Sequence, residues 1–249
     1  MRILLVSDLH YSLPQFDWVV GAAPDFDLVA LAGDHLDVSS SVPLHAQSVV
    51  VLRYLSLVQA SGHVAVSSGN HDLTGPDEAG EQAALWLSEA RQTGIPTDKD
   101  SLRIDETLIT ICPWWDGPIG REALALQLRL AAAHRPSRWI WLYHWPPSGS
   151  PTCWTGRRNY GDTDLVGWIE EHRPDMVLTG HVHEPPFKPD GAWADRIGGT
   201  WIFNPGRQSG PVPTRIEIDC TSGTARWFSL LGTEELSLDD TVAPARTVF

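Results

Sequence analysis

The chain has 249 residues, of which 31 are acidic and 18 basic, so its formal net charge is −13 when histidine is neutral. With 42% hydrophobic and 20% charged residues, the composition is that of a folded globular protein and excludes a disordered chain. The negative charge argues against long nucleic acid as a partner, because binding its backbone requires a basic face. No apolar run approaches the roughly 20 residues of a membrane-spanning helix, so we expect no membrane partner.

The cysteines and the first residues of the sequence bear on the compartment. Cys112, Cys153 and Cys220 are far apart and odd in number, which fits neither a disulfide framework nor a CxxC metal site. The opening segment MRILLVSDLH has no apolar region followed by a small-residue cleavage site, so it does not resemble a secretion signal. These features predict a protein of the reducing cytoplasm.

The first half of the chain alternates short apolar runs, typical of buried strands, with stretches of helical periodicity. Strands are expected at 2–7, 27–32 and 63–67, and helices at 14–21, 43–60 and 78–92. Within 43–60, for example, Val51, Leu55 and Val58 form one apolar stripe. The alternation of strand and helix predicts parallel strand pairing with helices packed on the sheet faces.

The second half is less regular. Further strands are expected at 107–112, 139–143, 176–179, 200–203, 214–218 and 225–229, and further helices at 121–134 and 164–172. The last three strands are interpreted as antiparallel strands that close a sheet. Residues 232–249 are polar, so we expect a surface tail after a single domain at 1–231. The sequence thus predicts one α/β domain with two central sheets and helices outside.

Polar side chains gather where five of the predicted strands end. The segments are Ser7-Asp8-Leu9-His10, Gly33-Asp34-His35, Gly69-Asn70-His71-Asp72, His144-Trp145-Pro146 and Gly180-His181-Val182-His183. The ligand crevice of an open α/β sheet lies at the carboxyl ends of its strands, so these segments are expected to meet. Each segment alone is most simply a turn or a structural histidine. Their joint occurrence, each behind an apolar run, favours a common site.

The residue types of these segments indicate a metal centre. Imidazole and carboxylate together suit Mn, Fe, Zn or Ni, whereas all-oxygen sets suit Mg and Ca. Asp8 and His10 are two residues apart, and the His-x-His at 181–183 has the same spacing, so each pair can hold one ion from extended chain. So many candidate ligands suit two divalent transition-metal ions that share a carboxylate. Asp34 is the natural bridge, and Gly33 leaves room for close backbone approach.

The ordered set resembles the calcineurin-like metallophosphoesterase family. Its blocks are Asp8-x-His10, Gly33-Asp34, Gly69-Asn70-His71-Asp72, His144 and Gly180-His181-x-His183, and they span residues 8–183 without a substitution. The resemblance implies a four-layer αββα sandwich of two mixed β-sheets flanked by helices. It also implies hydrolysis of phosphomonoesters or phosphodiesters with two metal ions. The set further resembles the branch that includes bacterial cyclic-nucleotide phosphodiesterases, although the blocks are shared across the family.

The resemblance also implies a role for each matching residue. The first ion would be held by Asp8, His10, Asp34 and His183, and the second by Asp34, Asn70, His144 and His181. His71 would face the substrate as a catalytic group and not as a ligand. Asp72 either orients His71 as part of the catalytic pair or places a charge at a helix N-terminus. Purple acid phosphatases have a tyrosine three residues after the bridging aspartate; here that residue is Asp37, which argues against an iron–tyrosinate centre.

The chemistry expected of this set is attack of hydroxide, held by two ions, on the phosphorus of a small phosphate ester. Two divalent ions add +4 to the charge of −13 and leave −9, so attraction of an anionic substrate must be local. A phosphodiesterase is favoured. The alternatives are a phosphomonoesterase of the same family and a metal-binding scaffold without catalysis, against which the intact motif counts. The sequence carries no signal for the oligomeric state.

The segment between the last two blocks, Trp145-Pro146-Pro147 and then 153–160 up to Tyr160, is aromatic and locally basic in an acidic protein. We expect a loop over the cleft in which Trp154, Arg157 and Arg158 contact the substrate, together with Asn70 and His71. A pair of solvated arginines on an ordinary loop is the alternative.

Three further features are left open by the sequence. Trp114 and Trp115 follow a strand end and either line the same cleft or belong to the core. His35 and Asp37 are either partners of the ligands or plain loop residues. The segment at 204–207, Asn-Pro-Gly-Arg, is interpreted as a turn between strands, with a remote chance that its arginine reaches the substrate.

Overall fold

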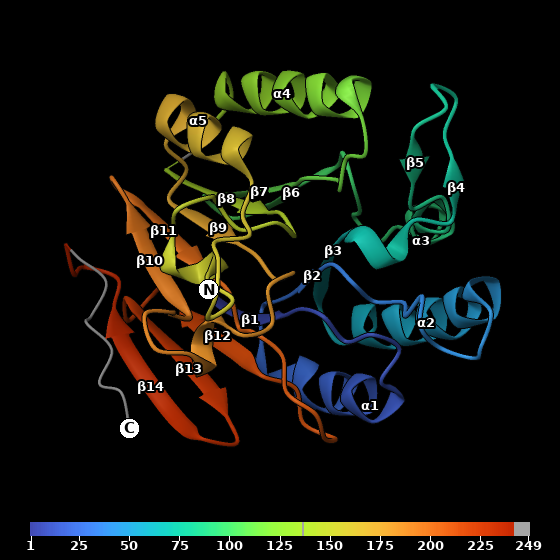
Figure 1. Cartoon of the computed structure of the whole chain (residues 1–249), viewed down its shortest axis with the longest axis horizontal. Helices are drawn as coiled ribbons and strands as arrows, with labels where there is room; N and C mark the ends of the chain where they lie inside the picture. Colours follow the sequence, from blue (N-terminus) through green and yellow to red (C-terminus); the bar gives the residue numbers. More distant parts are fainter. Residues whose placement is uncertain (136, 242–249) are drawn as a thin grey trace.

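The computed structural model describes residues 1–135 and 137–241 and contains two six-stranded sheets (Figure 1). The first contains, in spatial order, β14 (Gly232–Ser237), β13 (Thr224–Ser229), β12 (Arg215–Asp219), β1 (Arg2–Val6), β2 (Leu28–Ala32) and β3 (His63–Ser67). The second contains β10 (Ala194–Ile197), β11 (Thr200–Phe203), β9 (Met176–Leu178), β8 (Arg138–Leu142), β7 (Thr107–Ile111) and β6 (Ser101–Ile104). Each sheet is mixed: β1, β2 and β3 are parallel, as are β7, β8, β9 and β11, while the outer strands are antiparallel.

Alternating side chains of the central strands divide the core into three layers. Ile3 and Leu5 of β1 join the cluster between the two sheets, whereas Leu4 and Val6 pack against helices on the outer face. The helices on that face are α1 (Leu13–Ala22), α2 (Leu44–Gln59) and α3 (Leu87–Gln92). The other sheet is covered by α4 (Pro118–Ala132) and α5 (Thr163–His172), on the opposite side of the molecule (Figure 1). The predicted four-layer αββα sandwich is therefore confirmed.

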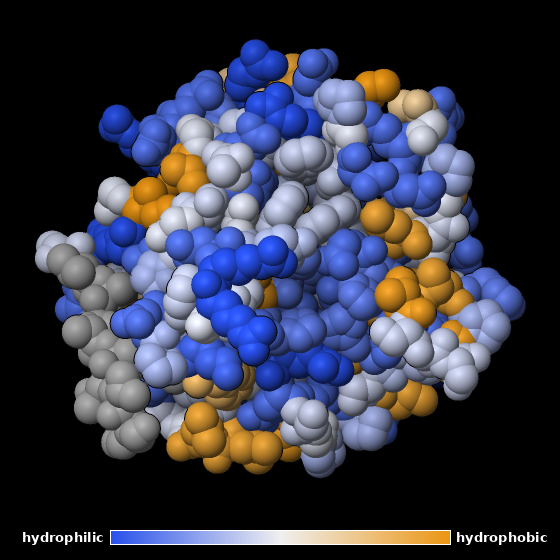
Figure 2. All heavy atoms as spheres, viewed as in Figure 1, coloured by the Kyte–Doolittle hydropathy of each residue, from blue (hydrophilic) through white to orange (hydrophobic). Residues whose placement is uncertain are grey.

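Short 3-10 helices complete the structure at Ala23–Asp25, Asn70–Asp72, Pro151–Cys153 and Pro185–Phe187. Among the described helices, none has the length and apolar character needed to cross a membrane. On the face seen in Figure 2, hydrophobic residues form separate patches, and the hollow near the centre is lined by hydrophilic and intermediate residues.

The predicted helix at 78–92 is wrong in its first part. A small antiparallel hairpin, β4 (Gly75–Pro76) and β5 (Gln82–Ala83), stands there, and only α3 is helical. The reason is a tertiary contact that local propensity does not reveal. The carboxylate of Glu81, in the hairpin, accepts the backbone N–H groups of Ile119 and Gly120 at 2.8 and 2.7 Å and so caps the start of α4.

The expected polar tail at 232–249 is also wrong at its start. Residues 232–237 form β14, which pairs antiparallel with β13 at the sheet edge. Only Leu236 of this strand is fully buried, so a polar edge strand resembles a tail in sequence. The remainder, 242–249, lies outside the described residues. In the same region, β11 does not close a sheet with β12 and β13, because it pairs parallel with β9 in the other sheet.

Candidate metal centre

Backbone hydrogen bonds fasten the loops at the strand ends to one another. The Asp8 N–H, after β1, donates to the carbonyl of Gly33 after β2 at 3.0 Å. The Gly180 N–H, after β9, donates to the carbonyl of His144 after β8 at 2.9 Å. The two sheets are joined where the His181 N–H faces both carboxylate oxygens of Asp8 at 3.1 Å. The segments that the sequence predicted to meet therefore do meet.

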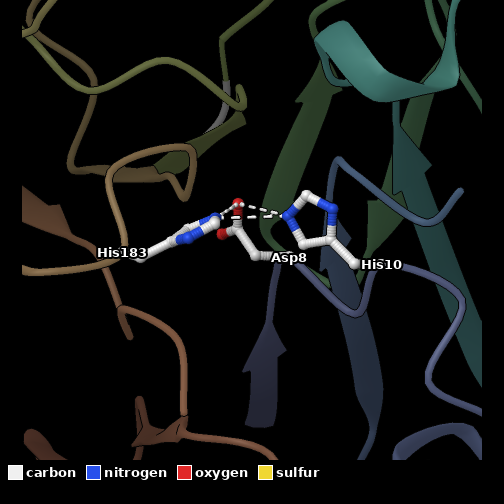
Figure 3. A group of neighbouring side chains, drawn as sticks. All are labelled: Asp8, His10 and His183. Atoms are coloured by element: carbon white, nitrogen blue, oxygen red, sulfur yellow. Dashed lines mark hydrogen bonds and ion pairs between the residues drawn. The ribbon is translucent and has the colours of Figure 1, made fainter. Parts of the chain in front are cut away.

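A first cluster consists of Asp8, His10 and His183, whose ligand atoms lie within 4.8 Å of one another (Figure 3). His183 Nε2 is 3.2 Å from Asp8 Oδ1 and also 3.2 Å from His10 Nε2. Figure 3 shows the carboxylate of Asp8 between the two imidazole rings, which approach it from opposite sides. Two facing ring nitrogens beside a buried carboxylate form a donor set suited to a cation.

A second cluster consists of Asp34, His144 and His181, again within 4.8 Å. The Nδ1–H of His144 donates to the carbonyl of Ala32 at 2.6 Å, which turns Nε2 toward Asp34 Oδ2 at 3.3 Å. Within the described chain, Asn70 Oδ1 and His181 Nε2 are buried and have no hydrogen-bond partner. Buried polar atoms are normally satisfied, so the unpaired His181 nitrogen, within 4.8 Å of ligand atoms of Asp34 and His144, fits a divalent ion.

Asp34 contacts both clusters. Its Oδ2 lies 3.3 Å from His144 Nε2 and 3.7 Å from His10 Nε2, while Oδ1 accepts the backbone N–H of His71 at 2.8 Å. This carboxylate is nearly fully buried. The position is the one that a shared ligand of two ions requires.

Four of the predicted ligands have strained backbone. Asp8, His10, Asp34 and His181 have φ angles of 55°, 42°, 54° and 67°, in the left-handed region that residues with a side chain rarely adopt. Such strain persists where surrounding structure fixes it, and it concentrates at functional sites. The hydrogen bonds between the strand-end loops supply that constraint.

Two glycines make the close approach possible. A Cβ at Gly33, whose φ is +80°, would lie 2.4 Å from Nδ1 of His144. One at Gly69 would lie 2.2 Å from Oδ1 of Asp34. The expectation that Gly33 permits close backbone approach is therefore confirmed.

The electrostatics of the site keep most of the predicted ligands in the form that binds a cation. Burial lowers the pKa of His10 to about 4 and that of His181 to about 3, so both imidazoles are neutral at pH 7. Burial would also lower the pKa of His144, but the charge and hydrogen bond of Asp34 outweigh it and raise this pKa to about 9. Burial opposes ionisation of Asp34 too, yet His144 holds the pKa of that carboxyl at about 2. A cation at the second cluster must therefore displace a proton from His144.

The side chains of His71 and Asp72 contact different groups and not each other. The His71 ring packs edge-on against His10, with centroids 4.5 Å apart, and its Nδ1 lies 3.9 Å from Oδ1 of Asp37. The carboxylate of buried Asp72 instead accepts three backbone N–H groups, from His35, Leu36 and Gly69, at 2.8–3.0 Å. Both oxygens of Asp72 thus hold the loops after β2 and β3, which agrees with the alternative of a charge at a helix N-terminus, and Asp37 is the carboxylate beside His71.

Aromatic rings surround the imidazole of His181. Trp114 stacks on Trp145 at 4.9 Å between centroids, and the two rings lie 5.1 and 5.7 Å from that of His181. Tyr160 stacks on His181 at 5.2 Å. Trp115 lies 6.2 Å from Trp145 and packs partly against the core of the second sheet. We call Trp114, Trp145 and Tyr160 the aromatic wall; the sequence pointed to Trp114 and to the aromatic segment over the cleft that contains the other two.

The predicted substrate loop meets the clusters through Tyr160, at its end. The indole N–H of Trp154 donates to the carbonyl of Pro189 at 3.0 Å. Arg157 and Arg158 are exposed, and the guanidinium of Arg158 lies 5.1 Å from the ring centroid of Tyr160. The contacts of Trp154 and Arg158 are therefore made within or next to the loop. No contact brings Trp154, Arg157 or Arg158 to the ligand atoms of the clusters.

The turn after β11 proves to be part of the site. The side-chain amide of buried Asn204 lies 3.1 and 3.0 Å from the carbonyls of Gly180 and Val182, and so holds the loop that carries the His-x-His segment. The Nε–H of Arg207 donates to the carbonyl of Asp8 at 3.0 Å. The sequence does contain a signal for this part of the site, because the polar segment 204–207 directly follows an apolar strand, as the other site segments do.

Comparison with known proteins identifies the family. The model of the family described as calcineurin-like phosphoesterase matches residues 1–185, so the chain belongs to that family of metal-dependent phosphohydrolases and the predicted resemblance is confirmed. No curated protein sequence matches.

Solved structures share the fold at low sequence identity. The protein TT1561 of Thermus thermophilus is 16% identical with a TM-score of 0.58, over 95% of this chain and 98% of that one. A dimetal phosphatase from Danio rerio is 13% identical with a TM-score of 0.58, over 96% and 98% of the two chains. At these identities the likeness shows the fold alone.

Gly33→Ala tests the packing of the second cluster. The added methyl group collides with the His144 ring, and the alanine must adopt a positive φ. We therefore expect loss of one bound ion per chain and of most activity. Gly167→Ala, in α5 with nothing within 4 Å of the added carbon, is the matched control. Metal content by mass spectrometry is the measurement. Two tightly held ions in Gly33→Ala would contradict the assigned position of His144.

Proposed function

We propose that the protein hydrolyses a small phosphodiester, with cyclic nucleotides among the candidate substrates, and that it does so with two divalent transition-metal ions. The observation that carries the proposal is the pair of donor clusters that both contact one buried carboxylate, with the unpaired Nε2 of His181 in the second cluster. The residues proposed to hold the ions are Asp8, His10, Asp34, Asn70, His144, His181 and His183. An intact set of this kind counts against a scaffold without catalysis.

The donor set suits Mn, Fe, Zn or Ni, since it combines imidazoles with carboxylates. When bound, the ions would supply Lewis-acid stabilisation of phosphoryl charge and lower the pKa of a coordinated water. The chain's own part is to hold the two donor clusters at a fixed separation through Asp34. Neutral His10 and His181 accept a cation without first losing a proton.

His71 is the group proposed to give a proton to the leaving oxygen. Its backbone N–H is tied to Asp34, and a ring nitrogen lies within 4.8 Å of ligand atoms of His10 and Asp34. An imidazole in this position reaches a phosphate held between the clusters, and histidine is the side chain suited to proton transfer near neutral pH. The same geometry would also allow His71 to bind a metal, which the metal content of a variant decides.

The aromatic wall supports an ester that carries a planar organic group, held by stacking at the His181 end of the site. Both a diester and an aryl monoester present such a group, so comparing hydrolysis of bis-p-nitrophenyl phosphate with that of p-nitrophenyl phosphate decides between diesterase and monoesterase. A cytoplasmic location is part of the proposal, supported by three cysteines that are all free thiols.

Asp34→Ala should abolish activity and leave at most one weakly held ion, because a shared carboxylate is lost from both clusters at once. Asp25→Ala, an exposed acid outside the site, controls for the change in charge. Metal content after gel filtration and turnover of a phosphate-ester panel are the measurements. Two ions held tightly by Asp34→Ala would show that the carboxylate is not a bridge.

His71→Ala should keep both ions and lose most of its rate on esters with poor leaving groups. An alkoxide or ribose oxygen needs a proton in the transition state, and general acid catalysis typically contributes about 10²–10⁴-fold. The loss should be smaller on p-nitrophenyl esters, whose leaving group hardly needs the proton. Equal losses on both ester types, with metals retained, would instead assign His71 to holding the phosphate; loss of an ion would make it a ligand.

The loop at 154–160 is proposed to influence substrate choice, with Trp154, Arg157 and Arg158 as its substrate-facing residues alongside Asn70 and His71. The double variant Arg157→Ala, Arg158→Ala should raise KM and leave metal content unchanged, since both side chains are exposed and lie outside the donor clusters. Steady-state kinetics across the ester panel measure the effect. Unchanged kinetics would return the pair to an ordinary solvated loop.

A further inference from the structure

Arg207 is a half-buried arginine at the first donor cluster. Its Nε–H donates to the backbone carbonyl of Asp8, and its charge disfavours protonation of His10 and His183. Hydrogen bonds of Arg207 therefore reach both the loop that carries Asp8 and the loop that carries His183. Neither the family match, which ends at residue 185, nor the ligand motif includes this position.

The backbone around Arg207 is fixed from several sides. Its own N–H donates to the carbonyl of His183 at 3.1 Å, and the carbonyl of Gly206 accepts the hydroxyl of Thr214 at 2.5 Å. The next residue is tied to α1, where the amide of Gln15 donates to the carbonyl of Gln208 at 3.1 Å. An arginine held this way loses little conformational entropy when it binds a ligand.

The guanidinium keeps donors to spare. Its single hydrogen bond uses Nε, and in the described parts of the chain neither terminal nitrogen has a hydrogen-bond partner. Among the described residues, no carboxylate lies within 4.0 Å of the Arg207 guanidinium. Other arginines do pair with acids, as Arg121 does with Asp164. A rigid guanidinium with two free NH₂ groups matches the oxygens of a phosphate.

Arg157 and Arg158 differ from Arg207 in exposure and in how they are anchored. Both are exposed, and the backbone N–H of each is anchored only by the hydroxyl of Thr155, at 3.3 and 3.2 Å. The Arg158 guanidinium lies against Tyr160 instead of a ligand residue. The arginine that the fold builds into the site is therefore the one in the turn after β11.

We propose that Arg207 binds the non-bridging phosphoryl oxygens of the substrate through its terminal NH₂ groups, at the end of the site formed by Asp8, His10 and His183. This inference rests on the proposed phosphoesterase function and adds a phosphate-binding residue outside the metal-ligand motif. Arg207 positions the phosphoryl group and carries part of its negative charge, so its contribution does not depend on the organic group of the ester.

The test uses the metal-loaded full chain and inorganic phosphate, which lacks any organic group. Arg207→Ala should weaken phosphate binding about 10- to 100-fold, the range of a charge-assisted hydrogen bond, while metal content stays at the wild-type value. Arg207→Lys keeps the charge and should recover part of the affinity. Arg53→Ala, an exposed arginine on α2, loses the same charge and should bind as the wild type does. Calorimetry and competitive inhibition give two independent measures of affinity.

Unchanged phosphate affinity in Arg207→Ala, with the wild type active and binding phosphate, overturns the role of Arg207 and leaves the proposed function intact. Loss of an ion in both Arg207 variants also overturns it, because the residue would then support the Asp8 loop. If the loaded wild type neither hydrolyses esters nor binds phosphate, the proposed function fails and the role of Arg207 fails with it.

Discussion

The buried carboxylate of Asp34 is the constraint around which the rest of the site is arranged. It lies between two groups of imidazoles, accepts the backbone N–H of His71, and holds the pKa of His144 far above that of its neighbours. A buried carboxylate needs polar partners at short distance. The neighbouring loops can approach Asp34 and His144 this closely only where their backbone carries no side chain, that is, at glycine. Gly33 and Gly69 permit this approach, at the ends of neighbouring parallel strands. Fold and chemistry therefore depend on the same few contacts.

Much of this fold could be predicted because its central strands are buried on both faces. Such strands appear in the sequence as short continuous apolar runs, and the polar residues behind them mark where each strand ends. The elements that were missed or misassigned lie at the margins. β14 is a polar edge strand, β6 and β10 are outer antiparallel strands, and the hairpin of β4 and β5 is held by Glu81 capping another helix. Their stability comes from contacts across the chain, which no local pattern encodes.

The same division applies within the site. Residues next to a strand end, such as Asp8 or His144, could be predicted to meet because topology alone brings the strand ends together. Asp72 also follows a strand end, yet the orientation of its side chain depends on which backbone N–H groups lie within reach. Three such groups satisfy both of its carboxylate oxygens. Trp145 and Tyr160 lie in the segment predicted to cover the cleft, but their contact with His181 could not be predicted, because stacking depends on loop conformation and long loops carry no periodicity.

Charge explains why a single arginine matters at the site of an acidic protein. A chain of net charge −13 repels a phosphate ester at long range, and two divalent ions would leave it at −9. Salt screens that repulsion beyond roughly 8–10 Å, so the last few ångströms decide whether an anion binds. Within that distance lie the two donor clusters and Arg207, which is unpaired with any described carboxylate. The acidic surface and the cationic centre are thus compatible, since the field that matters for binding is local and is built by the loops at the strand ends.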